Sequence, residues 1–133
     1  MFVDASALTA ILTDENDARV LAGHLRAAQR RITSALTVWE TTVAVARNLG
    51  LPLPEARKAV RDYLWLADIT VMPLPPEIGD GALDAFDRYG KGRHPASLNF
   101  GDCFAYACAR HFGASLLFKG DDFSKTDIAI PRP

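Results

Sequence analysis

Acidic residues interrupt several strongly hydrophobic segments, at positions where a soluble chain normally has apolar side chains. They are Asp4, Glu40, Asp102 and the Asp121-Asp122 pair. A carboxylate buried without a partner costs free energy, so it usually takes up a proton or finds a counter-charge. No Lys or Arg lies within the hydrophobic runs that carry the first three acids. One shared cation would satisfy them together, and Mg²⁺ and Mn²⁺ prefer carboxylate oxygens. The pattern therefore predicts a metal-dependent enzyme.

Each of the three early acids also has a purely structural interpretation. Asp4 ends an apolar segment and could be the N-cap of a following helix. Glu40 would share a helical face with Leu36 and Val43, at spacings of four and three, and its long stem could still reach water. Asp102 could be an acid favoured near a helix N-terminus by the helix dipole. Their joint occurrence in one short chain favours a functional site.

The later acids and two polar neighbours complete the set of candidates. Asp121 and Asp122 follow the apolar segment 116–118, although acidic pairs in turns are mostly structural. Asp127 is a weaker candidate. Ser6 could orient a carboxylate or a bound phosphate, or simply cap a turn. Asn99 could hydrogen-bond to Asp102 or to a metal-bound water.

Composition and length are typical of one ordinary globular domain, residues 1–133. The chain is 49% hydrophobic and 23% charged, with a net charge of −1, which argues against a broad basic nucleic-acid-binding surface. We expect no secretion signal and no membrane span, since no apolar run approaches about 18–20 residues. Cys103 and Cys108 are five apart on an expected helix and should not pair, which fits a cytoplasmic protein.

Short apolar segments alternate with helical patterns along the chain. We expect strands at 1–4, 31–34, 68–72 and 114–118, with a possible last strand at 127–130, and helices at 5–12, 17–30, 35–49, 54–66, 77–89 and 98–111. This alternation predicts an α/β fold with a mainly parallel sheet covered by helices on both faces. Sites in such sheets form beyond the carboxyl ends of the strands, where Asp4 and the Asp121-Asp122 pair would lie.

Four segments carry the acids in a specific order. They are Phe2-Val3-Asp4-Ala5-Ser6-Ala7-Leu8, Ser34-Ala35-Leu36-Thr37-Val38-Trp39-Glu40, Leu98-Asn99-Phe100-Gly101-Asp102-Cys103 and Leu117-Phe118-Lys119-Gly120-Asp121-Asp122-Phe123. Over nearly the whole chain, this order resembles the PIN-domain ribonucleases, and most closely the VapC-type toxins of bacterial toxin–antitoxin modules. The segment 90–94 also resembles a loop found in a subgroup of these toxins.

The resemblance implies a three-layer α/β/α fold and an endoribonuclease dependent on Mg²⁺ or Mn²⁺. It further implies a homodimer and a cognate antitoxin, which would cover the acids, for example with an Arg side chain. The acids that match the family's metal site are Asp4, Glu40 and Asp102. A fourth acid comes from the turn after the last core strand. Many relatives carry Thr-x-Asp-x-Asp-Phe there, and Gly120 falls at the first of these acidic positions. The fourth acid is then Asp122 or Asp121, and the register favours Asp122.

An acidic site would repel an RNA backbone unless nearby cations offset its charge. Candidates for phosphate contacts are Lys91, Arg93, His94 and Lys119, although each could be an ordinary solvated loop charge. The resemblance makes structured RNA such as tRNA a plausible substrate. Trp39, Trp65, Tyr63 and Phe86 could stack on bases, but their placement on expected helices favours packing in the core or at an interface.

Three other functions compete with the nuclease. An aspartyl phosphatase on a similar sheet typically needs a second carboxylate two residues after the first, and Ser6 holds that position. A phospho-accepting signalling domain would need an acidic pair near the first strand and a Lys after a late strand; only Lys119 is present. A non-enzymatic binding module would tolerate loss of the acids.

Overall fold

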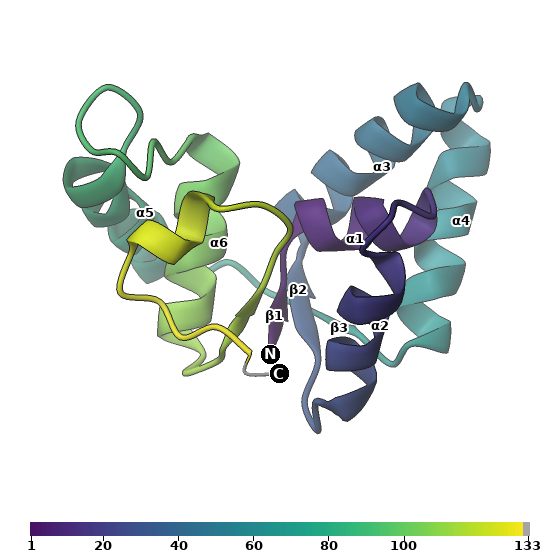
Figure 1. Cartoon of the computed structure of the whole chain (residues 1–133), viewed down its shortest axis with the longest axis horizontal. Coiled ribbons are helices and arrows are strands. Elements are labelled where there is room, and N and C mark those ends of the chain that lie inside the picture. Colours follow the sequence, from purple (N-terminus) through teal and green to yellow (C-terminus); the bar gives the residue numbers. More distant parts are fainter. Residues whose placement is uncertain (132–133) are drawn as a thin grey trace.

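A parallel four-stranded sheet forms the centre of the molecule (Figure 1). The computed structural model describes residues 1–131. The strands are β1 (Phe2–Val3), β2 (Ile32–Ser34), β3 (Thr70–Met72) and β4 (Leu116–Leu117), in the order β3-β2-β1-β4. All neighbouring pairs are parallel. The two earliest strands therefore lie in the middle, and β4 closes the sheet beside β1.

Helices cover both faces of the sheet, which gives the expected three-layer α/β/α architecture. Their bounds are α1 Ala5–Leu12, α2 Ala18–Ala27, α3 Ala35–Leu49, α4 Leu53–Leu66, α5 Pro76–Tyr89 and α6 Phe100–His111. Figure 1 shows α5 and α6 on one side of the sheet and α1 to α4 on the other. None of the helices in residues 1–131 is long and apolar enough to cross a membrane.

Alternation along the strands supplies the two cores. Phe2 and Leu116 pack with the α5–α6 side, whereas Val3 and Leu117 pack with the helices of the opposite face. All four side chains are essentially inaccessible to solvent. Successive side chains of a strand point to opposite faces, so two-residue strands suffice to join both layers. Cys103 and Cys108 are buried free thiols, as expected.

Local signals explain where the helix that carries Glu40 begins and ends. Ser34 is the N-cap of α3 and accepts a hydrogen bond from the backbone N–H of Thr37. Gly50 ends the helix with φ 62°, in the left-handed region where glycine has no Cβ penalty. The segment 31–34, weak in the sequence, is the central strand β2, and it places the start of α3 at the carboxyl edge of the sheet.

One sequence-based expectation about local structure is wrong. The segment 127–130 forms no strand. It meets β4 through a single backbone bond, from Leu116 N to Ala129 O, because Asp127 is held by the Tyr106 hydroxyl and lies beside Arg88. The turn after β4 continues into a short 3₁₀ helix, Asp122–Lys125.

The apolar face of α3 that carries Glu40 is also not its core face. The buried residues of α3 are Thr37, Thr41, Thr42 and Val45, and the threonine hydroxyls at 41 and 42 bond to the carbonyls four residues earlier. Leu36 and Val43 are only partly buried. Glu40 therefore lies on a half-open face of the helix, next to the sheet edge.

Candidate active site

Asp4 lies at the carboxyl end of β1 and is 6% exposed. Its Oδ2 accepts hydrogen bonds from the backbone N–H of Ser6 at 3.0 Å and from the Ser6 hydroxyl at 2.5 Å. Asp4 is thus the N-cap of α1 and also a buried carboxylate, so the capping and functional interpretations do not exclude each other. The cap fixes the direction in which the carboxylate points.

The carboxylate of Glu40 rests against the first turn of α6. A Cβ built on Gly101 would lie 2.3 Å from Oε2 and 2.7 Å from Oε1 of Glu40. Only glycine leaves room for this approach, which brings Glu40 next to the helix turn that carries Asp102. The sequence did not reveal this contact, although Gly101 directly precedes the acid.

Asp102 belongs to a capping box at the start of α6. Asn99 Oδ1 accepts a hydrogen bond from Asp102 N at 2.9 Å, and Asp102 Oδ2 accepts one from Asn99 N at 3.1 Å. The reciprocal pair satisfies two backbone donors that the helix itself cannot satisfy. Asn99 therefore holds Asp102 in place, and its side-chain oxygen is used by the cap.

The pKa shifts of Asp4, Glu40 and Asp102 link these acids with one another and with Asp122. Burial raises the pKa of Asp4, and the charge of Asp122 raises it further. Burial, and then the charges of Asp4 and Asp102, raise the pKa of Glu40 to about 7. Burial also raises the pKa of Asp102 to about 6, against the lowering effect of the Asn99 N–H, and Asp4 and Asp122 add to the rise. Asp121 contributes to none of these shifts.

Nothing in the described part of the chain neutralises this cluster. Every ion pair within residues 1–131 involves other acids. As they stand, no three His, Cys, Asp or Glu side chains in that range are gathered tightly enough to enclose an ion. The donor set nevertheless fits one: desolvated carboxylates that repel one another are what a hard divalent cation stabilises, because its charge favours their ionised forms.

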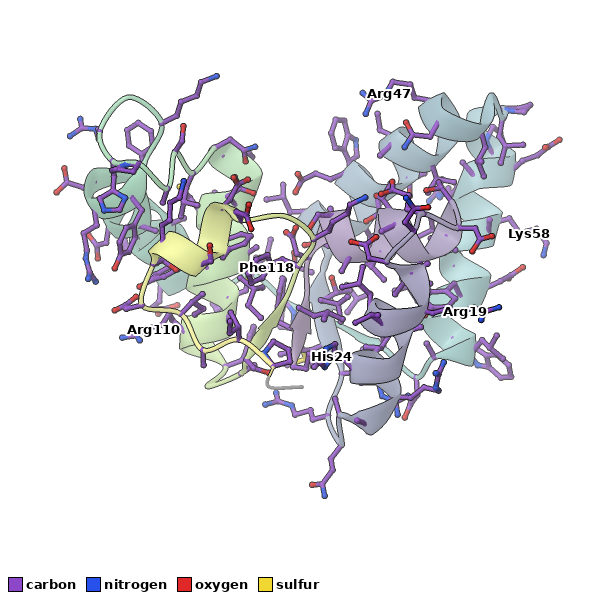
Figure 2. All side chains as sticks on the ribbon, viewed as in Figure 1. Arg19, His24, Arg47, Lys58, Arg110 and Phe118 are labelled. Atoms are coloured by element: carbon purple, nitrogen blue, oxygen red, sulfur yellow. The ribbon has the colours of Figure 1, made fainter. Side chains whose placement is uncertain are left out.

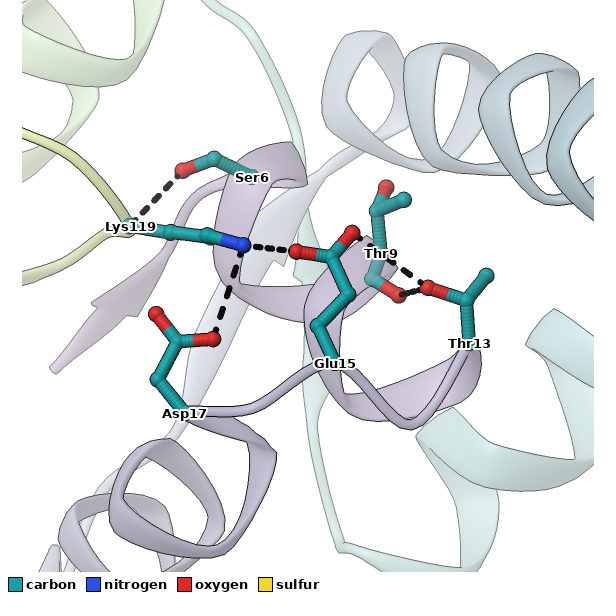
Figure 3. A network of polar contacts seen from close by, with 6 residues as sticks. All are labelled: Ser6, Thr9, Thr13, Glu15, Asp17 and Lys119. Atoms are coloured by element: carbon teal, nitrogen blue, oxygen red, sulfur yellow. Dashed lines mark hydrogen bonds and ion pairs between the residues drawn. The ribbon is translucent and has the colours of Figure 1, made fainter.

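Ser6 connects two segments that are far apart in sequence (Figure 3). Its hydroxyl donates to Asp4 and accepts from the backbone N–H of Lys119 at 3.0 Å. The amine of Lys119 contacts Glu15 and lies 3.6 Å from Asp17 Oδ1, so the turn after β4 is joined to the loop between α1 and α2. The Lys119 amine thus has acidic partners of its own, and its backbone helps to orient Asp4.

The other candidate cations and acids have separate environments. Arg93 pairs with Asp87 and lies over the ring of Phe86, and His94 Nδ1 accepts from the backbone N–H of Ala96. Lys91 is exposed. The hydrogen bond from the Tyr106 hydroxyl, together with Arg88, lowers the pKa of Asp127, which does not join the acid cluster.

Two of the four aromatic residues do not pack in the core, which leaves the interface alternative of the prediction. Trp39 is 66% exposed and Trp65 is 84% exposed, while Phe86 is partly exposed and Tyr63 partly buried. Trp39 directly precedes Glu40 and lines a cavity beside it. Arg47, which the sequence did not single out, lines the same cavity from a position two helical turns further along α3.

Comparison with known proteins identifies the class. Residues 1–129 match the PIN domain family, and the chain belongs to it. Relatives that match over nearly the full length of both chains include VapC ribonucleases. The chain is 41% identical over 129 residues to ribonuclease VapC of Mycolicibacterium smegmatis, covering 97% of this chain and 98% of the relative. It is 39% identical to ribonuclease VapC30 of Mycobacterium tuberculosis, covering 97% and 96%.

The fold has a counterpart among solved structures. The crystal structure of Mycobacterium tuberculosis VapC20, a sarcin-ricin loop cleaving toxin, aligns with a TM-score of 0.78 over 99% of this chain and 98% of that chain. At 20% identity this likeness bears on the fold alone. The predicted resemblance to the PIN-domain ribonucleases of the VapC type and the predicted α/β/α fold are confirmed.

Replacing Gly101 by Ala should displace Glu40 without unfolding the protein. The added methyl group meets only the end of a flexible side chain, and Ala is about 0.5–1 kcal/mol more favourable than Gly inside a helix. We expect the pKa of Glu40, measured by carboxyl NMR titration without metal, to fall from about 7 toward its ordinary value. Gly79→Ala in α5, where the new methyl group contacts nothing, is the control. An unchanged Glu40 pKa in a folded Gly101→Ala variant would contradict the contact.

The metal-free protein should lose stability as the pH rises from about 4.5 to about 7. Glu40 binds its proton more tightly in the folded state than in the unfolded chain, so deprotonation favours unfolding over that range. We expect Glu40→Gln to weaken this pH dependence and to raise the free energy of unfolding at pH 8 in EDTA, measured with urea. Exposed Glu55→Gln is the matched control. Equal pH slopes for wild type and Glu40→Gln would show that Glu40 is not desolvated.

Proposed function

We propose that this chain is the toxin endoribonuclease of a toxin–antitoxin pair and that it hydrolyses phosphodiester bonds of RNA with Mg²⁺ or Mn²⁺. The ligands would be Asp4, Glu40, Asp102 and Asp122. The observation that carries the proposal is that Asp4, Glu40, Asp102 and Asp122 are linked by their charges, with no counter-cation paired to them among residues 1–131. The relatives, named as VapC ribonucleases, supply the reaction class. The whole chain would work as a single domain.

A bound ion would activate water and offset charge on the scissile phosphate. The protein's own side chains divide into fixed and adjustable groups. Asp4 is held by Ser6, and Asp102 by Asn99, so their oxygens keep their positions. Glu40 accepts no hydrogen bond from residues 1–131, and its pKa of about 7 lets it hold a proton near neutral pH in the metal-free protein. Metal binding would therefore release a proton from Glu40.

Asp122 is the better candidate than Asp121 for the fourth acid. Both are exposed and lie in the same turn, but only the charge of Asp122 reaches Asp4 and Asp102. Asp127 is engaged by Tyr106 and Arg88, which argues against a role at the metal.

The partners proposed are an RNA substrate, an antitoxin and a second copy of the chain. Structured RNA, such as tRNA, is proposed as the substrate because the chain belongs to the PIN domain family. An apolar cavity of about 570 Å³ between α5 and α6, with Leu83 and Phe100 exposed at its edge, offers surface for a protein partner.

The side chains proposed to contact RNA phosphates are Lys91, Arg93, His94 and Lys119. A cytoplasmic location fits an RNA substrate and free thiols. No observation favours a phosphatase or a signalling domain.

The proposed ribonuclease function is tested with purified, antitoxin-free protein and total cellular RNA. We expect discrete cleavage with Mg²⁺ or Mn²⁺, none with EDTA, and none by Asp4→Asn or Asp102→Asn. Asp122→Asn should reduce the cleavage rate by more than about 100-fold, since loss of a residue that merely supports a ligand costs about 10–100-fold. Asp121→Asn should retain the wild-type rate within about twofold and serves as the matched control.

Cleavage that persists in the Asp4 and Asp102 variants would assign the activity to a contaminant or to another site. Equal losses in the Asp121 and Asp122 variants would contradict the choice of Asp122. Unfolding curves of each variant in EDTA separate lost chemistry from lost structure, because removing a repelling charge should not destabilise the metal-free protein.

A further inference from the structure

A cavity of about 610 Å³ opens beside the acid cluster. Its walls are α1, α3 and the turn after β4, and its lining includes Ser6, Glu40 and Lys119. Glu40 is the one of the four acids that lines the cavity, and Asp4 lies next to it through its hydrogen bond with Ser6. Whatever occupies this space lies within reach of the proposed metal site.

One strip of α3 forms a whole wall of the cavity. The lining residues of this helix are Trp39, Glu40, Val43, Ala44, Arg47 and Asn48. Their spacing of one, four, five, eight and nine follows a single face of an α-helix. Trp39 and Arg47 are about 12 Å apart along the helix axis, at 1.5 Å per residue. Figure 2 shows Arg47 at the outer end of α3, away from the sheet.

The chemistry of this wall differs from that of an ordinary protein-binding groove. It combines a large exposed aromatic side chain with charged groups, and Arg47 makes no ion pair within residues 1–131. Desolvating unpaired charges beneath a partner chain is unfavourable, and interface cores are depleted in charge. The apolar cavity between α5 and α6 has only Asp80 among its charged lining residues and suits a protein better.

We propose that this cavity is a nucleotide-binding subsite for unstacked, single-stranded RNA, in which a base stacks on the indole of Trp39 and a backbone phosphate contacts Arg47. The inference rests on the proposed ribonuclease function. A base offers a π-face that can stack on the exposed indole of Trp39. A phosphate offers the negatively charged partner that Arg47 does not have among residues 1–131. Because positions 39 and 47 are about 12 Å apart along the helix axis, we expect the base and the phosphate to belong to different nucleotides. The subsite therefore reads a short stretch of strand leading to the acids.

Tryptophan fluorescence observes the stacking directly. The chain has only two tryptophans, so Trp65→Phe leaves Trp39 as the sole emitter. The probe is a mixed-sequence single-stranded RNA 12-mer, added in the presence of MgCl₂. The protein also carries Asp4→Asn, so that it does not cleave the probe. We expect saturable quenching of Trp39 by the single strand and little quenching by the same sequence as a duplex. The converse variant, Trp39→Phe, reports on Trp65, whose emission should not change.

Affinity and salt dependence test the two contacts separately. Trp39→Ala should weaken binding of the 12-mer by about 5- to 150-fold, as loss of one stacked base does, and Trp39→Phe should recover part of this. Trp65→Ala, which removes an even more exposed tryptophan from α4, should bind as wild type. Arg47→Gln should reduce the slope of log affinity against log salt by about 1, whereas exposed Arg57→Gln should not.

The outcomes also separate this inference from the function on which it rests. If wild type neither binds nor cleaves RNA, the proposed function fails. If wild type cleaves RNA but Trp39→Ala binds the 12-mer with unchanged affinity, the subsite is wrong while the nuclease stands. If Trp39→Ala instead converts a dimer to monomers in light scattering, with RNA affinity per protomer unchanged, this face of α3 is a contact between copies and the proposal is overturned.

Discussion

Mutual repulsion among carboxylates that water cannot fully screen is the constraint around which this molecule is arranged. Asp4, Glu40 and Asp102 each lose hydration on folding and each feels the charge of at least one other acid. Left to themselves, such groups would move apart or take up protons. The surrounding structure prevents the acids from moving apart. A bound divalent cation would remove their tendency to take up protons.

Two of these acids are restrained by local contacts, and the third is placed by packing between helices. The hydroxyl of Ser6, two residues away, holds Asp4, and a reciprocal capping box holds Asp102. Glu40 has no such restraint, but the absence of a side chain at Gly101 admits its carboxylate to the first turn of α6. The parallel sheet then brings these groups together, because β1, β2 and β4 end at the same edge and the segment after each strand begins there.

The sequence predicted most of the helices and strands and selected the candidate acids, but it could not predict the surroundings of those acids. Alternating apolar segments and helix punctuation at Ser34 and Gly50 located the helices within a few residues. The approach of Glu40 to Gly101 depends on how α3 crosses α6, which cannot be predicted from the sequence pattern of one helix. The exposure of Trp39 could not be predicted either, because an apolar helix face has the same sequence pattern whether it packs in a core or lines a cavity. The last expected strand failed because the side chain of Asp127 found partners on α5 and α6.

The pairing of β4 with β1 has a consequence for the protein's synthesis. Phe2 aligns with Leu116 and Val3 with Leu117, so the first strand pairs with β2 early but gains its second neighbour only after residue 117 has been made. Asp4 leaves the ribosome 118 positions before Asp122, a delay of roughly 6–24 s at about 5–20 residues per second. A nascent chain thus carries Asp4 for seconds before the turn that follows β4 is made, and β4 is the last strand that becomes available to the sheet.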